Sequence, residues 1–392
     1  MNKFDVIVIG AGPVGSTFAR YIANEGFKVA ILERKKEVGV PLQCAGLLGK
    51  KIKDINILPD KYILNKVYGA YLHSPSNTIL KVGRKDPQAY VIDRIAYDKF
   101  LAEQAVDAGA KLLLNHKVKD VNIKTGEVYL ENNSNKIFQG KIIVGTDGHA
   151  SKVSDKFNPK TKSVMAAQYL LDMKKDVFDM DNVNPHVNSN ISPGFIWMIP
   201  ISKSMARVGL FANKDYNKLN HILKDFIHDN ILYKNATILK KYQGFIPVYN
   251  PKKKIVKDRA ILIGDAASQV KPTTGGGLII GFECAKIAAN TVSKTLQKED
   301  INILKKYENE YRKRFKNELK VQIEVQIIFK SLTNQNLEYM FLKLKEGNAE
   351  NLISEYGDMD SQSILIKEMI KNRLFFSILP KLLTRRIGNL WK

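Results

Sequence analysis

The stretch Asp5-Val-Ile-Val-Ile-Gly10-Ala-Gly12-Pro13-Val-Gly15 decides the fold of this chain. Its apolar run is typical of a buried strand, and the spacing G-x-G-x-x-G is typical of a turn that holds a phosphate at the start of a helix. We expect the helix to run from Pro13 to Glu25, and Phe27-Lys-Val-Ala-Ile-Leu-Glu33 to form the next strand. This strand–helix–strand opening indicates an α/β protein with a parallel sheet.

The residues of this turn have separate tasks. Gly10 permits the tight bend, Gly12 lets the backbone approach a pyrophosphate, and Gly15 lets the helix pack closely on the strand. Pro13 opens the helix, whose positive end then faces the phosphates. Glu33 ends the second strand 18 residues after Gly15. An acidic side chain at that place accepts hydrogen bonds from an adenosine ribose.

A second glycine-rich stretch lies about 250 residues downstream. Ala260-Ile-Leu-Ile-Gly264-Asp265 is interpreted as another buried strand, and Pro272-Thr-Thr-Gly275-Gly276-Gly277 opens a helix expected over 277–296. We expect Asp265 to accept hydrogen bonds from ribityl hydroxyls. The backbone N–H groups of the glycine run are suited to stabilise the negative charge of a reduced flavin. Two such turns in this order predict one extended dinucleotide held at both ends, which is FAD.

Two segments between the glycine stretches are further candidates for cofactor contacts. Arg94 begins a helix expected to reach Ala108, and we expect it to bind a phosphate or the flavin side of the cofactor. A solvated arginine at a helix start is the alternative. Ile142-Ile-Val-Gly145-Thr-Asp147-Gly148 is a strand that ends in Asp-Gly, for which a plain turn is the alternative.

The order of these segments predicts a dinucleotide domain that is interrupted by a second sheet. Residues 1–64, 88–160 and 251–300 are assigned to a discontinuous FAD-binding domain. Residues 65–87 and 161–250 are assigned to a β-rich substrate domain, which includes a helix near Tyr216–Asp229. Residues 301–392 are expected to form a C-terminal helical region, and 35–58 to be mainly loop.

Composition limits the class of protein. The chain has no run of 18 apolar residues, so we expect no membrane-spanning helix. Cys44 and Cys284 are too few and too far apart for a disulfide framework, which fits a reducing cytoplasm, and no Cys/His cluster has metal-ligand spacing. The net charge of +23 implies attraction to nucleic acid, an anionic membrane or a phosphorylated substrate, while a lysine-rich solvated surface explains it equally well.

Taken together, these segments resemble the flavoprotein superfamily of p-hydroxybenzoate hydroxylase and the geranylgeranyl reductases. Three features are similar to the geranylgeranyl reductases in particular. Pro41-Leu-Gln-Cys44-Ala45-Gly46 resembles the family's P-x-x-C-x-G segment. Phe195-Ile-Trp197-Met-Ile199-Pro200, followed by Gly209, resembles its Y-x-W-x-F-P-x(7–8)-G-x-G pattern, with Phe195, Ile199 and Phe211 in place of Tyr, Phe and Gly. The third is the spacing of the segment from Gly264 to Gly277.

The resemblance implies an α/β fold of the p-hydroxybenzoate hydroxylase type: a Rossmann-type FAD-binding domain, an inserted antiparallel β-sheet substrate domain and a C-terminal helical region. It implies that FAD-dependent reduction saturates isolated C=C bonds of geranylgeranyl chains in archaeal ether (phospho)lipid precursors. The expected cofactor contacts are Gly10, Gly12, Pro13, Gly15, Glu33, Arg34, Cys44, Ala45, Gly46, Arg94, Asp147, Gly148, Gly264, Asp265, Pro272, Gly275, Gly276 and Gly277.

The resemblance also implies roles in catalysis for three side chains. Cys44 is placed near the flavin as a proton donor or a positioning group, with an ordinary buried thiol as the alternative. Trp197 and Phe195 are expected to line the substrate tunnel and to stabilise a developing cation through their ring faces, worth about 1–2 kcal/mol. A core aromatic residue is the alternative for Trp197.

Other functions remain open on this scaffold. A flavin monooxygenase acting on aromatic substrates, a flavin halogenase (whose W-x-W-x-I-P motif is close to F-x-W-x-I-P) and a quinone-linked dehydrogenase share the glycine stretches. A nucleic-acid-binding protein is disfavoured because no aromatic–basic interleaving or zinc motif is present. The electron donor is undetermined among NAD(P)H, ferredoxin and a deazaflavin, since no second nucleotide loop is visible.

The C-terminal residues 371–392 contain six basic residues and no acidic one, and Trp391 lies near their end. Apolar runs that alternate with Lys and Arg are typical of an interfacial helix on an anionic membrane. A helix pair docked on the protein is the alternative. We therefore expect a cytoplasmic protein that associates peripherally with the inner face of the membrane.

Overall fold

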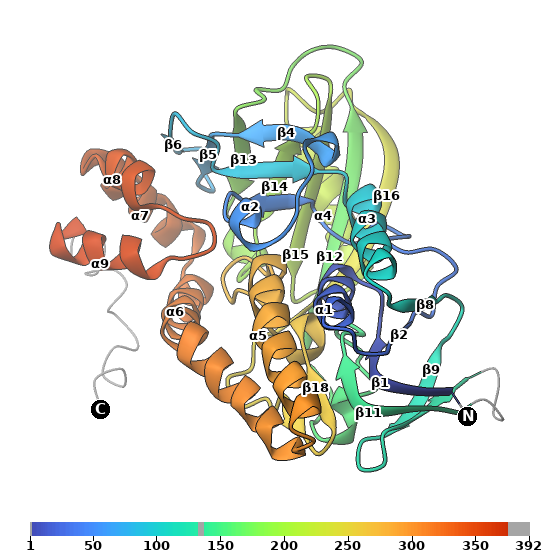
Figure 1. Ribbon diagram of the computed structural model, residues 1–392. Coiled ribbons are helices and arrows are strands. Elements are labelled where there is room, and N and C mark those ends of the chain that lie inside the picture. The colour runs from blue at the N-terminus through green and yellow to red at the C-terminus, as the bar shows by residue number, and fades with distance from the viewer. Residues whose placement is uncertain (1, 132–136, 375–392) are drawn as a thin grey trace.

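The computed structural model describes residues 2–131 and 137–374. Figure 1 shows two β-sheet regions, one below the other, with helices of the C-terminal region along one side. The predicted α/β fold, with a Rossmann-type sheet, an inserted sheet and C-terminal helices, is confirmed.

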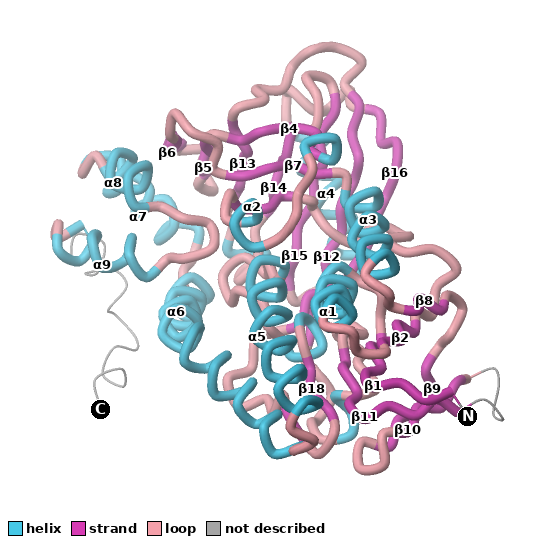
Figure 2. Tube along the Cα trace, viewed as in Figure 1, coloured by secondary structure: helices cyan, strands magenta, loops and turns pink. Residues whose placement is uncertain are grey.

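The first sheet carries the N-terminal glycine turn. Its strand order is β17 (Val256–Lys257), β18 (Ala260–Leu262), β11 (Ile137–Gly145), β1 (Asn2–Ile9), β2 (Val29–Leu32) and β8 (Lys111–Leu113). All neighbours from β18 to β8 are parallel, whereas β17, and the β9 (Val118–Asn122) and β10 (Glu127–Leu130) extension, pair antiparallel. Helices α1 (Pro13–Asn24), α3 (Arg94–Asp107) and α5 (Leu278–Gln297) pack beside these strands (Figure 2).

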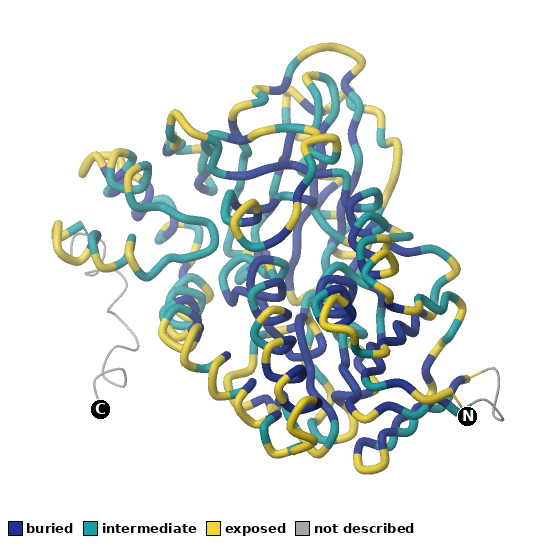
Figure 3. Tube along the Cα trace, viewed as in Figure 1, coloured by how far each residue is buried: buried dark blue, intermediate teal, exposed yellow. Residues whose placement is uncertain are grey.

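The strand register brings the predicted cofactor motifs to one edge of this sheet. Ile9 pairs with both Leu32 and Gly145, and Gly145 pairs with Leu262. Each of these residues lies one or two positions before a polar residue or a glycine that begins a turn. In open α/β sheets, ligands bind outside the carboxyl ends of the strands, so this edge is where a nucleotide is expected. Figure 3 shows the buried residues gathered along these strands and α5.

The second sheet presents different side chains on its two faces. Its strand order is β16 (Thr237–Pro247), β12 (Ser163–Asp172), β15 (Met205–Ala212), β14 (Ile196–Pro200), β13 (Asn182–His186), β5 (Gly69–His73) and β6 (Ile79–Gly83). It is antiparallel except for the parallel pair β13–β5. Helix α4 (Tyr216–Asp229) covers one face, where Tyr169 and Met198 pack against Leu219 and Leu223. The opposite face is therefore free to meet the first domain.

The segment expected to be mainly loop contains short regular elements. β3 (Leu47–Gly49) pairs with β7 (Ala89–Ile92), which also pairs with β4 (Ile63–Val67), and α2 (Ile52–Ile55) follows β3. Residues 35–58 are mainly loop, as expected: β3 and α2 are the only strand and helix among them.

The C-terminal region consists of helices, as predicted, in its described part. These are α6 (Lys305–Ser331), α7 (Asn334–Glu346), α8 (Ala349–Tyr356) and α9 (Ser363–Lys371). Figure 1 shows α7 and α8 beside the β5–β6 end of the second sheet, with α9 packed against α8 and α6. Glu338 joins α7 to the β5–β6 turn by accepting hydrogen bonds from Ser74, Ser76 and Thr78.

Candidate active site

The three glycines of the first turn have the geometry that a dinucleotide site needs. Gly10 has φ of 103°, and a Cβ there would lie 2.6 Å from the Thr146 carbonyl oxygen. A Cβ on Gly15 would collide with the Gly10 carbonyl oxygen and the Thr146 hydroxyl. A Cβ on Gly12 would meet no atom within 4 Å. Gly10 and Gly15 are thus required by the protein itself, whereas Gly12 faces open space into which a ligand fits.

Both helices that follow a glycine turn begin without a side-chain cap. Gly12 is the N-cap of α1 and Gly277 the N-cap of α5, and neither helix receives a side-chain hydrogen bond there. In contrast, Asp93 caps α3 and Asp215 caps α4. The first N–H groups of α1 and α5 are therefore available to an external anion.

Glu33 lies beside the first turn at the end of β2. Its two carboxylate oxygens accept hydrogen bonds from the N–H groups of Ala11 (2.8 Å) and Lys35 (2.9 Å). Each oxygen keeps a second lone pair, so the carboxylate still has room for ribose hydroxyls. The neighbouring Arg34 is exposed, and its charge adds to burial in lowering the pKa of His149.

The Asp147-Gly148 turn lies directly behind the glycine turn. Thr146 donates hydrogen bonds from its hydroxyl to the carbonyl oxygens of Ile9 and Gly10, both at 2.9 Å. One carboxylate oxygen of Asp147 accepts from the Lys152 N–H at 2.7 Å, while the other is buried without a hydrogen-bond partner. Burial raises the pKa of Asp147. An unpaired buried oxygen is uncommon, and it can accept a hydrogen bond from a ligand or a water molecule.

Asp265 is the carboxylate at the second glycine stretch. Its side chain is accessible to solvent, yet protein atoms surround it so closely that burial raises its pKa to about 6, partly offset by the charge of Arg94. The carboxylate of Asp265 is thus accessible to a ligand although protein atoms surround it. Gly277 lies next to Asp265 Oδ1, since a Cβ there would be 3.2 Å away. Asp265 and the start of α5 therefore face the same space.

Asp265 makes FAD binding dependent on pH. The carboxylate form accepts hydrogen bonds from cofactor hydroxyls, so binding must release the proton that Asp265 holds below about pH 6. We expect FAD affinity to rise with pH up to about 6, by at most about tenfold per pH unit, and to level off above it. The stability of the cofactor-free protein should fall over the same pH range, because the folded state holds this proton more tightly than the unfolded chain.

Fluorescence titration of FAD across this pH range measures the dependence. The Asp265→Asn variant, which cannot release a proton, should bind FAD more weakly and with a flat profile. An equally steep profile in Asp265→Asn would assign the proton to another group.

Cys44 lies between two buried guanidinium groups. Arg94 donates to Asp98 from Nε (3.1 Å) and Nη2 (2.9 Å), and Asp98 and Cys44 raise the pKa of Arg94 against the opposing effect of burial. Arg207 of β15 donates to the carbonyl oxygen of Ala45 at 2.9 Å and interacts electrostatically with Cys44. The Cys44 sulfur accepts from the Gly46 N–H at 3.3 Å. Cys44 therefore interacts with two cationic side chains.

Trp197 lies on the free face of the second sheet, where Gly209 makes room for it. A Cβ on Gly209 would be 2.5 Å from the indole ring. The indole N–H donates to Gln168 Oε1 at 3.0 Å, and Gln168 Nε2 donates to the Cys44 carbonyl oxygen at 3.4 Å. Trp197 is thereby connected to the Cys44 segment through Gln168.

The same sheet face carries three aromatic rings and touches both candidate loops. Phe195 packs edge-on against Trp197 (6.2 Å) and Phe211 (5.4 Å). Ile246 of β16 packs against Gly275, where a Cβ would be 2.9 Å from its side chain. These rings lie near the Cys44 segment (residues 41–46) and the second glycine-rich turn (residues 272–277), which we call the glycine loop. A face with three aromatic rings is suited to bind a hydrocarbon chain.

The structure divides the predicted residues between two groups. One gathers around Gly12, with Gly10, Pro13, Gly15, Glu33, Arg34, Asp147, Gly148 and Gly264, which lies against Val14. The other gathers around Arg94, with Cys44, Ala45, Gly46, Phe195, Trp197, Asp265, Pro272, Gly275, Gly276 and Gly277. Sequence reasoning missed Thr146, Gln168, Arg207 and Tyr242, the last with a pKa raised by burial against the charge of Arg207. The i,i+4 spacing of Arg94 and Asp98 is a sequence signal for their ion pair.

The residues present fit an FAD molecule that extends between these two groups. Gly12 leaves space for a pyrophosphate, Asp147 has an unpaired buried oxygen, and Asp265 is an accessible carboxylate beside the uncapped start of α5. No cluster that could hold a metal ion occurs among residues 2–131 and 137–374.

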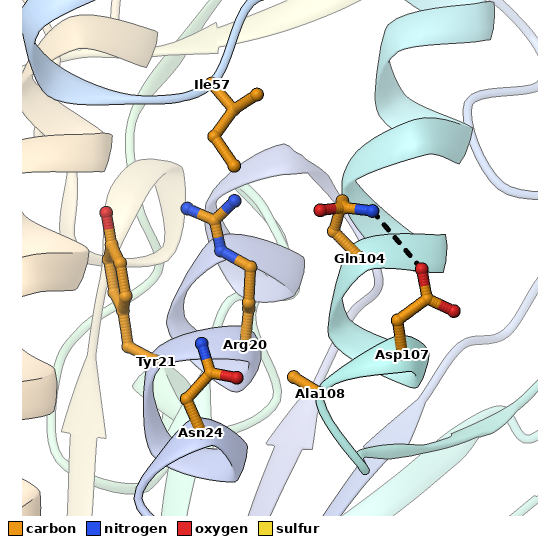
Figure 4. Close-up of a pocket in the computed structure, with 7 residues that line it drawn as sticks. All are labelled: Arg20, Tyr21, Asn24, Ile57, Gln104, Asp107 and Ala108. Carbon is orange, nitrogen blue, oxygen red and sulfur yellow. Dashed lines mark hydrogen bonds between the residues drawn. The ribbon is translucent and has the colours of Figure 1, made fainter.

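A separate hollow of about 410 Å³ lies between the carboxyl-terminal halves of α1 and α3 (Figure 4). Arg20 donates to Asn56 at 2.9 Å, and Gln104 donates to Asp107 at 3.2 Å. The glycine turn is at the opposite end of α1, so this hollow is not part of the candidate site.

Comparison with known proteins identifies relatives over nearly the whole chain. A family model described as "Lycopene cyclase protein" matches residues 5–364. An uncharacterized protein of Methanocaldococcus jannaschii is 35% identical, covering 97% of this chain and 99% of its own. Digeranylgeranylglycerophospholipid reductase 2 of Methanococcoides burtonii is 31% identical, covering 88% of this chain and 89% of its own.

A solved structure also shares the fold. The geranylgeranyl bacteriochlorophyll reductase-like protein of Thermoplasma acidophilum superposes with a TM-score of 0.83 at 24% identity, over 97% of this chain and 99% of that one. This likeness extends over both sheets and the described C-terminal helices.

Proposed function

The chain belongs to the geranylgeranyl reductase family of FAD-dependent oxidoreductases, and from this premise we propose that it saturates isolated C=C bonds of geranylgeranyl chains in archaeal ether (phospho)lipid precursors. The apolar face formed by Phe195, Trp197 and Phe211, set against the Cys44 loop and the glycine loop, is the observation that carries this proposal.

We assign FAD to the two groups of residues around Gly12 and Arg94, and the substrate to the free face of the second sheet. The proposed division into an FAD-binding domain, a β-rich substrate domain and a C-terminal helical region keeps the boundaries predicted from the sequence. When bound, the reduced flavin supplies a hydride. Helix α5, whose first N–H groups have no side-chain cap, is suited to hold the negative charge that a reduced flavin carries.

The protein's own residues supply the rest of the proposed chemistry. An unactivated alkene accepts hydride only as positive charge develops on its more substituted carbon, so a proton must reach the other carbon. Cys44 is proposed to hold that proton, since its segment is connected to the aromatic face through Gln168 and its side chain interacts with Arg94 and Arg207. The faces of Trp197 and Phe195 are proposed to stabilise the developing cation, by about 1–2 kcal/mol.

Mass spectrometry of the lipid product tests this function. The FAD-loaded protein is reduced with dithionite and incubated with an unsaturated digeranylgeranylglyceryl lipid. We expect the mass of two hydrogen atoms to be added for each double bond reduced. An unchanged lipid, together with rapid aerobic NAD(P)H oxidation and a hydroxylated aromatic product, would favour a monooxygenase; a halogenated product would favour a halogenase.

We further propose that the protein works in the cytoplasm at the inner face of an anionic membrane and takes electrons from NAD(P)H, ferredoxin or a deazaflavin. Among residues 2–131 and 137–374, no helix is long and apolar enough to cross a membrane. The last described helix, α9, leaves Ile364 and Ile370 exposed. The basic segment predicted to bind the membrane, 371–392, lies outside the described residues from position 375 onward.

Removal of residues 371–392 should reduce membrane binding. The six basic residues are worth about 1 kcal/mol each near an anionic surface, so recovery with anionic liposomes in a flotation assay should fall at least about tenfold. Zwitterionic liposomes are the control, on which both proteins should float poorly. Equal recovery of the full-length and truncated proteins on anionic liposomes would rule out the membrane role of this segment.

A further inference from the structure

A buried ion pair connects the glycine loop to the C-terminal helical region. Lys271 Nζ lies 2.7 Å from Asp360 Oδ1 and donates a second hydrogen bond to the Met359 carbonyl oxygen, also at 2.7 Å. The two charged side chains are only 5% and 6% exposed. The two residues are 89 positions apart in the sequence. Lys271 directly precedes the glycine loop, and Asp360 lies in the turn before α9.

Lys271 also frames the glycine loop through its own backbone and side-chain stem. Its N–H donates to the Gly276 carbonyl oxygen, and its carbonyl oxygen accepts from the Gly275 N–H, both at 2.9 Å. A Cβ on Gly276 would lie 2.8 Å from Lys271 Cε, so the stem runs directly against the loop. The loop cannot change conformation without moving Lys271.

Residues 358–363, which we call the strap, are fixed firmly on the C-terminal side. Glu318 of α6 accepts hydrogen bonds from the Ser361 hydroxyl (2.9 Å) and the N–H groups of Gln362 (2.6 Å) and Ser363 (3.2 Å). Gln362 in turn donates to the Thr273 hydroxyl at 2.8 Å. The strap therefore holds the glycine loop at two places.

Stability alone does not account for this arrangement. The second carboxylate oxygen of Asp360 is buried without a hydrogen-bond partner. Removing two charges from water can cost more than a buried pair returns, and replacing such a pair by apolar side chains of similar volume is often neutral or stabilising. The strap also reaches the proposed substrate face, because Met359 packs with the cluster that contains Trp197 and Ala45.

We propose that Lys271 is a positioning residue for the glycine loop. The Lys271–Asp360 pair holds the N–H groups of Gly275–Gly277 and the start of α5 in the one orientation that stabilises the negative charge of a reduced flavin. The C-terminal helices thus act on the cofactor site through the strap. The proposal rests on the proposed function only in requiring FAD at this site.

The midpoint potential of the bound flavin tests the proposal. The variant Lys271→Met/Asp360→Leu replaces the pair with apolar side chains and leaves no unpaired buried charge. If the loop loses its orientation, the preference for reduced over oxidised flavin should fall about tenfold, which lowers the potential by about 30 mV. If the contact were merely structural, its removal would weaken the binding of reduced and oxidised flavin equally and leave the potential unchanged.

A second ion pair of the strap provides the matched control. Lys51 and Asp358 also join the strap to the first domain, but their side chains are 40% and 34% exposed. The Lys51→Met variant removes this exposed pair but keeps the hydrogen bond from the Asp360 N–H to Asp358 Oδ1 (2.7 Å), and should keep the potential of the unmodified protein. A fall of the same size in both variants would overturn the proposal, as would no fall in Lys271→Met/Asp360→Leu.

A third variant keeps the test decisive if the first does not fold. Gln362→Leu removes the neutral hydrogen bond to Thr273. The preference for reduced over oxidised flavin should fall about twofold, which lowers the potential by about 9 mV. An unchanged potential would then overturn the proposal. Failure of the unmodified protein to bind FAD would instead contradict the proposed function.

Discussion

The Gly12→Ala variant should fold normally and bind FAD about 100-fold more weakly. Gly12 has φ of −67° and ψ of 170°, which alanine adopts without strain, and its Cβ would meet no protein atom within 4 Å. The cofactor-free variant should therefore be as stable as the unmodified protein, or more stable by up to about 1 kcal/mol. The added methyl group would, however, occupy the space through which a pyrophosphate approaches the backbone. The loss corresponds to about 2.7 kcal/mol of binding free energy.

Two measurements on each variant separate binding from folding: the thermal midpoint of the cofactor-free protein and the dissociation constant for FAD. Gly26→Ala is the matched control, because it places the same methyl group just beyond the other end of α1. Gly26 has φ of 84°, so alanine there should lower stability by about 1 kcal/mol and leave FAD affinity unchanged. Tight FAD binding by Gly12→Ala would show that this turn does not hold the pyrophosphate.

Local sequence rules were sufficient where a site is built from one continuous segment. The first glycine turn, the strand that ends at Glu33 and the strand before Asp265 are each specified by residues close in sequence. An apolar run, a glycine at a position of positive φ and an acidic residue at the strand end allow few alternatives. The register that aligns Ile9, Leu32 and Leu262 then brings these segments to one edge.

Sequence rules were insufficient where segments far apart meet. Arg207 lies more than 150 residues from Ala45, whose carbonyl oxygen it binds, and Gln168 reaches Cys44 across 124 residues. No spacing in the sequence indicates such a contact. Gly209 shows the difference clearly: the family pattern predicted a glycine at this place, but only the structure shows that the Trp197 indole requires it.

Arg94 shows how a correct element can leave a function open. The helix start was predicted, and α3 begins at Arg94. The guanidinium is engaged by Asp98, which the i,i+4 spacing allows, yet it also acts electrostatically on Asp265 and Cys44. Binding of the cofactor by Arg94 therefore remains our proposal. Its support is that Arg94 interacts with both Asp265, on the proposed cofactor side, and Cys44, the proposed proton donor.

The surroundings of Cys44 favour proton donation over a purely structural role. Its sulfur accepts a hydrogen bond from Gly46, and Arg94 and Arg207 flank it with positive charge. The chain's other cysteine, Cys284, is fully buried in α5, where burial raises the pKa of its thiol well above the usual value. The same substitution at the two cysteines should therefore have opposite effects on catalysis and stability.

Cys44→Ser should lower turnover with reduced FAD by about 100-fold, the lower end of what a general acid contributes. A serine hydroxyl fills nearly the same volume but gives up its proton far less readily, so the affinity for FAD should stay within about threefold. Cys284→Ser should leave turnover unchanged and reduce stability, because it buries a hydroxyl in an apolar core. The rate of lipid reduction, followed by mass spectrometry, and an FAD titration of both variants measure these effects. Turnover that is equal in Cys44→Ser and the unmodified protein would exclude Cys44 as the proton donor, and the phenol of Tyr242, which interacts with Arg207 on the same sheet face, would become the next group to test.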